Sequence, residues 1–331
     1  MAGGGVGAYN TSGSIQGRQM SRSTFGFIRP LDDVAYVEIP VAGITSNVYV
    51  YGPPSETLLI DTGGDGFAAA IIETLEANGY GADGVKAIAV THGHGDHYGG
   101  AAALAVWSGA PVWAHPGAAV EIEDHWGGYI RPGSPNTNLD ADSWQRFRGG
   151  AGDEVRVARL LRDGDVIEHA GRRLDLHHLP GHQRGLVGLV EADRRLAFVG
   201  DLIQGGMDCS ANWLGLFTDV AGQRRSLARL ADLHPAWLFK GHREPRSGDD
   251  VPADIAAAIG RLDDIEGALI GVLEEGPVTL AQAVRAVYET VLDMDIGAPT
   301  NFGVCTVTAF LLDLAQRGLA RRTRDLMWES V

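Results

Sequence analysis

Residues 90–100 read VTHGHGDHYGG and place three histidines and one aspartate within six positions: His92, His94, Asp96 and His97. The apolar run at 86–90 that precedes them is typical of a buried strand. We expect Gly93 and Gly95 to let the backbone turn sharply, so that His92 and His94 face one side and the next two ligands the other. Imidazole nitrogens and carboxylates ligate Zn, Fe and Mn. The stretch therefore predicts a metal-binding loop.

Three further apolar runs end in a residue of the same chemical kind. LDLHHLPGH leads to His182, LAFVGD leads to Asp201, and WLFKGH leads to His242. Strand ends at one edge of a sheet are where α/β folds assemble their sites. We therefore expect seven groups of metal-ligand type, delivered from four strand ends, to lie close together.

These motifs resemble those of the metallo-β-lactamase superfamily, and in particular its glyoxalase II-like dinuclear metallohydrolases. HGHGDH at 92–97 resembles the HxHxDH signature, and PGH, GD and GH follow in the family's order. LLIDTGG at 58–64 resembles the first motif, whose aspartate, here Asp61, usually supports the metal loop. The resemblance covers about residues 33–245.

The resemblance implies an α/β (α+β) fold, the αββα sandwich, with a site at one edge between two sheets. It also implies two divalent metal ions, with zinc expected and iron or manganese as alternatives. By this resemblance the first metal is held by His92, His94 and His182. The second is held by Asp96, His97 and His242, and Asp201 bridges the two.

The expected function is that of a metal-dependent hydrolase. A water between two ions has its pKa lowered from about 15.7 towards 7, which makes a metal-bound hydroxide available at neutral pH. Asp96 and Asp201 are the candidates for proton transfer, and the expected substrate is a small molecule with an ester, thioester, lactone or related bond. The alternatives are an RNA or phosphodiester hydrolase, an iron-dependent redox enzyme of the same superfamily, and a binding protein without turnover.

Composition narrows the partners and the compartment. The 331-residue chain carries a net charge of −15, which disfavours nucleic acid and anionic membranes as partners. Its two cysteines lie far apart, and we expect a reducing cytoplasm. We find neither a signal-peptide core nor the roughly 20 apolar residues of a membrane span.

The chain divides into three parts by its pattern. Residues 1–25 predict a flexible tail, and 26–250 a catalytic domain in which strands and helices alternate. Within that domain, 121–160 predict an irregular insertion over the active site. Residues 251–331 show three helical periodicities and predict a helical extension. Its apolar faces need burial against the core or a second subunit, and we expect a homodimer.

Aromatic residues on two loops are candidates for the substrate pocket. Aromatics over a metal site commonly line an apolar wall, although packing within the loops is an equal alternative. Lys240 and Arg243 flank His242 and are either ligands of an anionic substrate group or solvated surface residues. The candidate pocket residues are Trp126, Tyr129, Trp144, Trp213 and Phe217.

Overall fold

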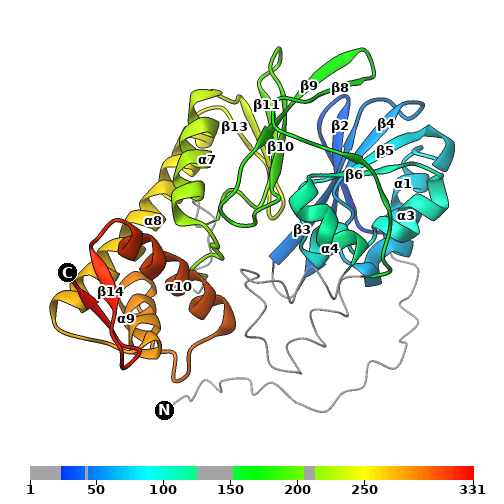
Figure 1. Cartoon of the computed structure of the whole chain (residues 1–331). Helices are drawn as coiled ribbons and strands as arrows, with labels where there is room; N and C mark the ends of the chain where they lie inside the picture. Colours follow the sequence, from blue (N-terminus) through cyan, green and yellow to red (C-terminus); the bar gives the residue numbers. More distant parts are fainter. Residues whose placement is uncertain (1–23, 42–43, 125–151, 205–212) are drawn as a thin grey trace, which may run out of the picture.

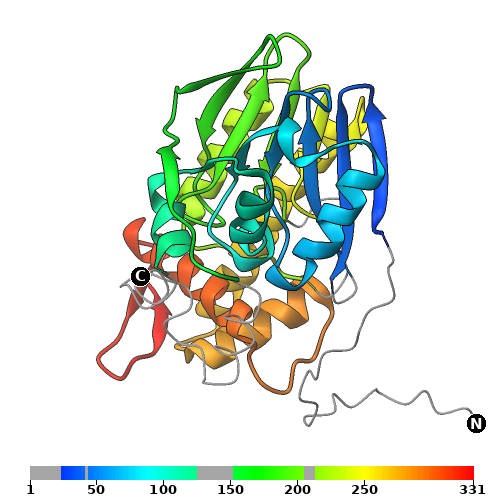
Figure 2. The same ribbon diagram turned by 90° about the vertical axis from the view of Figure 1, so that its right-hand side faces the viewer.

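A computed structural model describes residues 24–41, 44–124, 152–204 and 213–331. Two β-sheets face each other, and helices cover the outer face of each sheet (Figures 1 and 2). The expected fold class, an α/β arrangement of the αββα type, is confirmed. Central strands such as Thr57–Ile60 and Leu196–Gly200 are nearly all apolar, because both of their faces are buried.

The first sheet has seven strands in sequence order. Its first half is an antiparallel meander, and its second half is parallel because α1 (Ala68–Ala77), α3 (Ala101–Ser108) and α4 (Pro116–Glu123) lie between consecutive strands. The strands are β1 (Gly26–Leu31), β2 (Val34–Val41), β3 (Ile44–Tyr51), β4 (Thr57–Ile60), β5 (Val85–Val90), β6 (Val112–Ala114) and β7 (Val157–Leu160).

The second sheet has six strands in the order β13-β12-β11-β10-β9-β8. Strands β10 and β11 form an antiparallel hairpin, whereas β11 and β12 are parallel and are joined through α7 (Val220–Asp232). The strands are β8 (Val166–His169), β9 (Arg172–His178), β10 (Val187–Glu191), β11 (Leu196–Gly200), β12 (Trp237–Lys240) and β13 (Arg246–Ser247).

Aromatic side chains fill the space between the two sheets. Tyr49 from β3 packs edge-to-face on Phe198 and Phe239, with ring centroids 5.4 and 5.5 Å apart. Tyr51 meets Phe198 in the same way at 5.9 Å. Such pairs contribute about 0.5–1.5 kcal/mol each beyond the area they bury. They hold the sheets in one arrangement, which fixes where the strand ends meet.

The C-terminal region contains α8 (Asp250–Glu274), α9 (Leu280–Leu292) and α10 (Asn301–Gln316). A two-stranded sheet that the helical periodicity did not predict follows, made of β14 (Ala320–Arg322) and β15 (Trp328–Ser330). A capping box at Thr279 begins α9. The region shares one hydrophobic core with α7 and the second sheet. Among the described residues, no helix combines the length and apolarity that a membrane span requires.

Both ends of the predicted irregular segment 121–160 are regular. Helix α4 continues to Glu123, and 157–160 form β7 at the edge of the first sheet. The sequence pattern did not predict these elements, because the helix carries glutamates and the short strand contains Arg159. Residues 125–151 lie outside the described residues, as do 1–23 of the predicted tail.

Candidate metal centre

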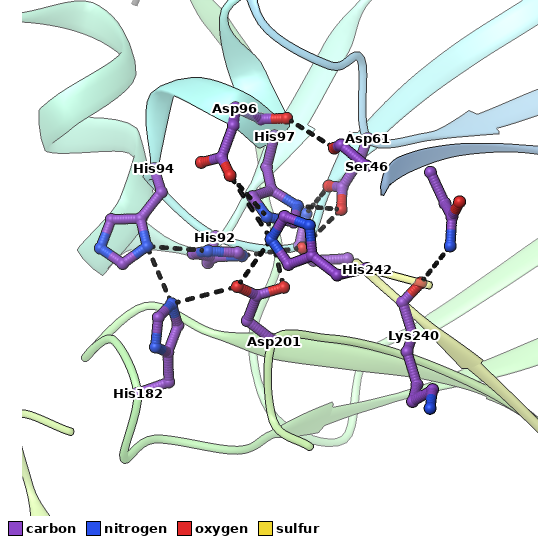
Figure 3. A network of polar contacts seen from close by, with 12 residues as sticks. Ser46, Asp61, His92, His94, Asp96, His97, His182, Asp201, Lys240 and His242 are labelled. Carbon is purple, nitrogen blue, oxygen red and sulfur yellow. Dashed lines mark hydrogen bonds and ion pairs between the residues drawn. The ribbon is translucent and has the colours of Figure 1, made fainter. Parts of the chain in front are cut away.

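Four loops that follow strands bring the seven predicted ligands to one place (Figure 3). Strand β5 ends at Val90, two residues before the first of the histidines. Strand β11 ends directly before Asp201, and β12 ends two residues before His242. The residue pair Ser46 and His242 forms an isolated antiparallel bridge between the two sheets. The site therefore lies at the edge where both sheets meet.

The ligand atoms form groups of the size that holds a metal ion. Within each of two groups, all ligand atoms lie within 4.8 Å of one another. In the first, His94 Nδ1 lies 3.1 Å from His92 Nε2 and 2.8 Å from His182 Nε2. The second contains Asp96, His97 and His242. These are the two sets that the resemblance implies.

Asp201 lies between the two groups. Its Oδ2 is 3.6 Å from His182 Nε2 and 3.2 Å from His242 Nε2, and its Oδ1 is 3.3 Å from His97 Nε2. Figure 3 shows its carboxylate in the middle of the cluster, facing both groups. Its side chain is only 9% exposed. One carboxylate therefore contacts members of both groups.

Two buried atoms of this cluster make no hydrogen bond among the described residues: His97 Nε2 and Asp201 Oδ1. Buried polar atoms are nearly always satisfied, so such atoms call for a partner. They lie 3.3 Å apart, and once His97 loses its proton both offer lone pairs of the kind that borderline divalent ions accept. The residues present therefore fit a pair of divalent metal ions.

Hydrogen bonds on the far side of three rings orient their metal-facing nitrogens. The Nδ1–H of His97 donates to Asp61 Oδ2 at 2.9 Å, and that of His242 donates to the Thr45 carbonyl at 2.9 Å. The Nδ1 of His182 lies 2.8 Å from the Leu216 carbonyl. Such contacts occupy Nδ1, so that Nε2 is the ring nitrogen that faces a bound metal.

Asp61 also supports the metal loop itself. Its Oδ1 accepts from the backbone N–H of Thr91 at 2.7 Å, and its Oδ2 accepts from the Thr91 hydroxyl at 2.8 Å. It has a positive φ of 63° and is buried. These contacts match the supporting role that the sequence motif implies for it.

The first group is prepared to bind a cation without losing protons. Burial, together with the neighbouring histidines, holds the pKa values of His92 and His182 below the usual range and lowers the pKa of His94 to about 3. All three rings are therefore neutral at pH 7. A neutral imidazole is the form that ligates a metal.

The second group has the opposite electrostatics. Burial alone would lower the pKa of His97 and of His242, but the carboxylates around them raise the first well above its ordinary value and the second to about 10. Burial works against ionisation of Asp96 and Asp201 as well, yet the adjacent histidines hold both carboxyl pKa values below the usual range. The second group is therefore a set of ion pairs that a metal would replace.

Two glycines are required by close contacts at the site. A Cβ on Gly241 would overlap Asp201 Oδ1 and the ring of His97, and a Cβ on Gly93 would overlap the carboxylate of Glu121. The backbone bends at 91–93, as expected, but neither Gly93 nor Gly95 has a positive φ, so neither adopts a conformation that only glycine favours. Gly95 instead begins α2 (Gly95–Tyr98).

The predicted pocket residues are placed unequally. Phe217 is fully buried and packs on Phe310 of α10, so its ring belongs to the core and not to a wall that a substrate reaches. Trp213 is partly exposed and stacks edge-to-face on Phe302 at 5.3 Å. Lys240 points away from the site and pairs with Asp254 at 2.9 Å. Trp126, Tyr129 and Trp144 lie outside the described residues.

The sequence did not predict several groups that support the metal ligands. The carbonyls of Thr45 and Leu216 carry no signal, because every residue has a carbonyl. Glu121 is buried on α4 and accepts from the Gln183 amide next to His182, which links α4 to the loop that carries His182. Its charge within the run GAAVEIE was the available signal.

Similarity to known proteins agrees with the family that the sequence motifs resemble. The family model described as the metallo-beta-lactamase superfamily matches residues 42–242. A hydroxyacylglutathione hydrolase of Haemophilus influenzae is 29% identical over 175 residues, which are 51% of this chain and 72% of that protein. An acyl-coenzyme A thioesterase of Gallus gallus is 30% identical over 143 residues, which are 43% of this chain and 50% of that protein.

Solved structures extend the similarity to the C-terminal region. A metallo-beta-lactamase family protein from Thermus thermophilus superposes with a TM-score of 0.72, covers 91% of this chain and 99% of its own, and is 22% identical. A beta-lactamase domain protein from Burkholderia ambifaria superposes with a TM-score of 0.71, covers 95% of this chain and 96% of its own, and is 17% identical. At these identities the likeness establishes the fold.

Proposed function

Because the chain belongs to the metallo-β-lactamase superfamily, we propose that it is a dinuclear metal-dependent hydrolase of small thioesters and related esters. The observation that carries the proposal is the position of Asp201, whose carboxylate contacts members of both ligand groups. A mononuclear site would not need the second group of Asp96, His97 and His242. Metal ions bound there would lower the pKa of a water and polarise the scissile carbonyl.

The substrate class follows from the named relatives and from charge. Hydroxyacylglutathione and acyl-coenzyme A esters are both thioesters, and the proteins that bear these names each match about half of this chain or slightly less. The net charge of −15 argues against RNA as a substrate. Ester and lactone bonds share the same carbonyl chemistry and belong to the proposal as secondary substrates.

The two aspartates have different parts in this proposal. The side chain of Asp201 is 9% exposed, and that of Asp96 is 42% exposed. Both carboxyl pKa values are held low, so both are anionic at neutral pH. We assign Asp201 to holding the two metals together. We assign Asp96, which solvent reaches, to accepting the proton released in the reaction and passing it on.

The finer parts of the proposal concern the metal and the assembly. Zinc suits a mixed set of histidines and aspartates, with iron and manganese as the alternatives. We also propose that the chain forms a homodimer, works in the cytoplasm and acts on a small-molecule substrate. Elemental analysis of protein purified without added metal tests the metal, and light scattering tests the dimer.

A substrate panel with matched variants tests the activity. The zinc-loaded chain is assayed on an acylglutathione, an acyl-coenzyme A, a homoserine lactone and a bis-aryl phosphodiester. We expect thioester turnover that a chelator abolishes and zinc restores. Asp201→Ala should lose it, and Asp193→Ala, at the exposed turn between β10 and β11, should retain it. Turnover of the phosphodiester alone, or activity that depends on redox-active iron, would refute the proposal.

A further inference from the structure

One stripe of α10 runs along the loop segment 213–217, whose Leu216 carbonyl contacts the metal ligand His182. The stripe consists of residues 302, 306 and 310, which are four apart and share a helix face. Phe302 contacts Trp213 with ring centroids 5.3 Å apart, and Phe310 contacts Phe217 at 6.2 Å. The C-terminal helix therefore contacts both ends of the segment 213–217.

The hydroxyl of Thr306, in the middle of the stripe, bonds two backbone groups of this segment. It donates to the Gly215 carbonyl at 2.8 Å and accepts from the Phe217 backbone N–H at 3.2 Å. Thr306 is completely buried. Both bonds are made by the residues on either side of Leu216, so the hydroxyl restrains the peptide groups that orient the Leu216 carbonyl.

The Leu216 carbonyl faces the Nδ1 atom of His182, which the Gln204 side chain also approaches. The Nδ1 of His182 lies 2.8 Å from the Leu216 carbonyl and 2.5 Å from the Gln204 amide nitrogen. If Nδ1 accepts from Gln204, the proton of the neutral ring sits on Nε2, which then cannot ligate a metal. If Nδ1 donates to Leu216, Nε2 is free to ligate. Which tautomer prevails depends on how firmly the Leu216 carbonyl is held in place.

We propose that Thr306 is a positioning residue of the metal centre, which acts through the Leu216 carbonyl to hold His182 in its metal-binding tautomer. The inference rests on the proposed function only in that His182 serves as a ligand. It makes the C-terminal helical region a part of the metal centre, although no described residue of that region belongs to the ligand groups. The full ligand set of the catalytic domain would then bind metal weakly without α10.

Metal binding, measured without any substrate, tests this proposal. Thr306→Val keeps the shape of the side chain and removes the hydroxyl. We expect its apparent affinity for zinc, measured by competition with a chromophoric chelator, to fall about tenfold, as for other outer contacts of a metal ligand. The visible band of the cobalt(II)-loaded protein should change in position or intensity, because the coordination of one ion changes. Thr306→Ser restores the hydroxyl and should restore both readouts.

Thr308→Val is the matched control, because it makes the same change two residues away on a partly exposed position of α10. It should leave zinc affinity and the cobalt spectrum unchanged. A Thr306→Val protein with wild-type affinity and spectrum, or a serine variant that fails to restore them, would overturn the role of Thr306. If Thr306→Val does not fold, Thr306→Ala gives the same comparison. A wild-type chain that binds no divalent metal would instead overturn the proposed function.

Discussion

At the scale of single residues, the metal centre combines two neighbouring groups of ligands that differ in their electrostatic environment. Three buried histidines are neutral, and two others are kept protonated by carboxylates in the absence of metal. Outer contacts to Asp61, Thr45 and Leu216 set which ring nitrogen faces inward. The ligand types alone do not provide this difference, because it comes from burial and from the neighbours of each ring.

Asp61 should matter for metal binding although it is not a ligand. Asp61→Asn removes the anionic acceptor of the His97 Nδ1–H and one acceptor of the Thr91 bonds. We expect zinc affinity to fall about 10- to 100-fold by chelator competition, the range typical of such outer contacts. Asp65→Asn, at an exposed position four residues on, should bind zinc normally. Equal affinity in both variants would contradict the assignment.

The metal-free protein should lose stability as the pH rises above neutral. The pKa of His242 is about 10 in the folded chain against an ordinary value of 6.5, so between these values the folded state holds a proton that the unfolded state has released. The stabilisation is full below pH 6.5 and disappears as the pH rises through about 10. Urea unfolding of chelator-treated protein should show that the advantage of wild type over His242→Gln shrinks across this window. An advantage that grows with pH would contradict the sign.

At the scale of elements, the site is a property of where strands end. Each ligand loop follows a strand of one of two facing sheets, and Gly241 lets the end of β12 approach Asp201 closely. The backbone N–H of Gly241 donates to the Gly200 carbonyl at 2.9 Å, which ties the ends of β11 and β12 together. The spacing of the two ligand groups therefore depends on this contact.

Gly241→Ala should disrupt the site without unfolding the domain. The added methyl would overlap Asp201 Oδ1 and the His97 ring, so one of the two side chains must move. We expect loss of at least one bound zinc per chain by elemental analysis, with the circular dichroism spectrum unchanged. Gly267→Ala on α8, where an added Cβ meets no atom within 4 Å, is the control and should keep its zinc. Full zinc content in Gly241→Ala would contradict this account.

The sequence predicts those parts of the structure that leave a local pattern. Apolar runs before His92, His182, Asp201 and His242 predict the ligands and their strands, because each strand carries its own signal. Strand β1 contains Pro30, which is tolerated at a sheet edge but hides the strand pattern. The roles of Phe217 and Thr306 depend on contacts with residues some 90 positions apart, and no local pattern records them.

At the scale of the whole molecule, the C-terminal region is fastened to the catalytic part by buried charge as well as by apolar packing. Lys240, which lies two residues before His242, pairs with Asp254 of α8 at 2.9 Å, and both side chains are buried. Arg224 of α7 also pairs with Asp263 and Glu266 of α8. Breaking a buried pair leaves a charge without its partner and is costly.

Lys240→Met should therefore destabilise the chain by about 3–5 kcal/mol in urea unfolding, because it removes the cation from a buried ion pair with Asp254. The double variant Lys240→Met/Asp254→Leu should recover most of that loss. Arg225→Met, whose guanidinium lies 4.0 Å from the exposed carboxylate of Asp219, is the control and should cost about 0–1 kcal/mol. A double variant no more stable than Lys240→Met would show that the charge pair is not the cause.

In the proposed function, Asp201 holds two metal ions within one cluster. Anomalous X-ray diffraction from zinc-loaded crystals at the zinc absorption edge measures this directly. We expect two peaks about 3.5–4 Å apart, one beside His92, His94 and His182 and the other beside Asp96, His97 and His242, with the Asp201 carboxylate between them. A single peak at full zinc loading, or two peaks of which only one contacts Asp201, would contradict it.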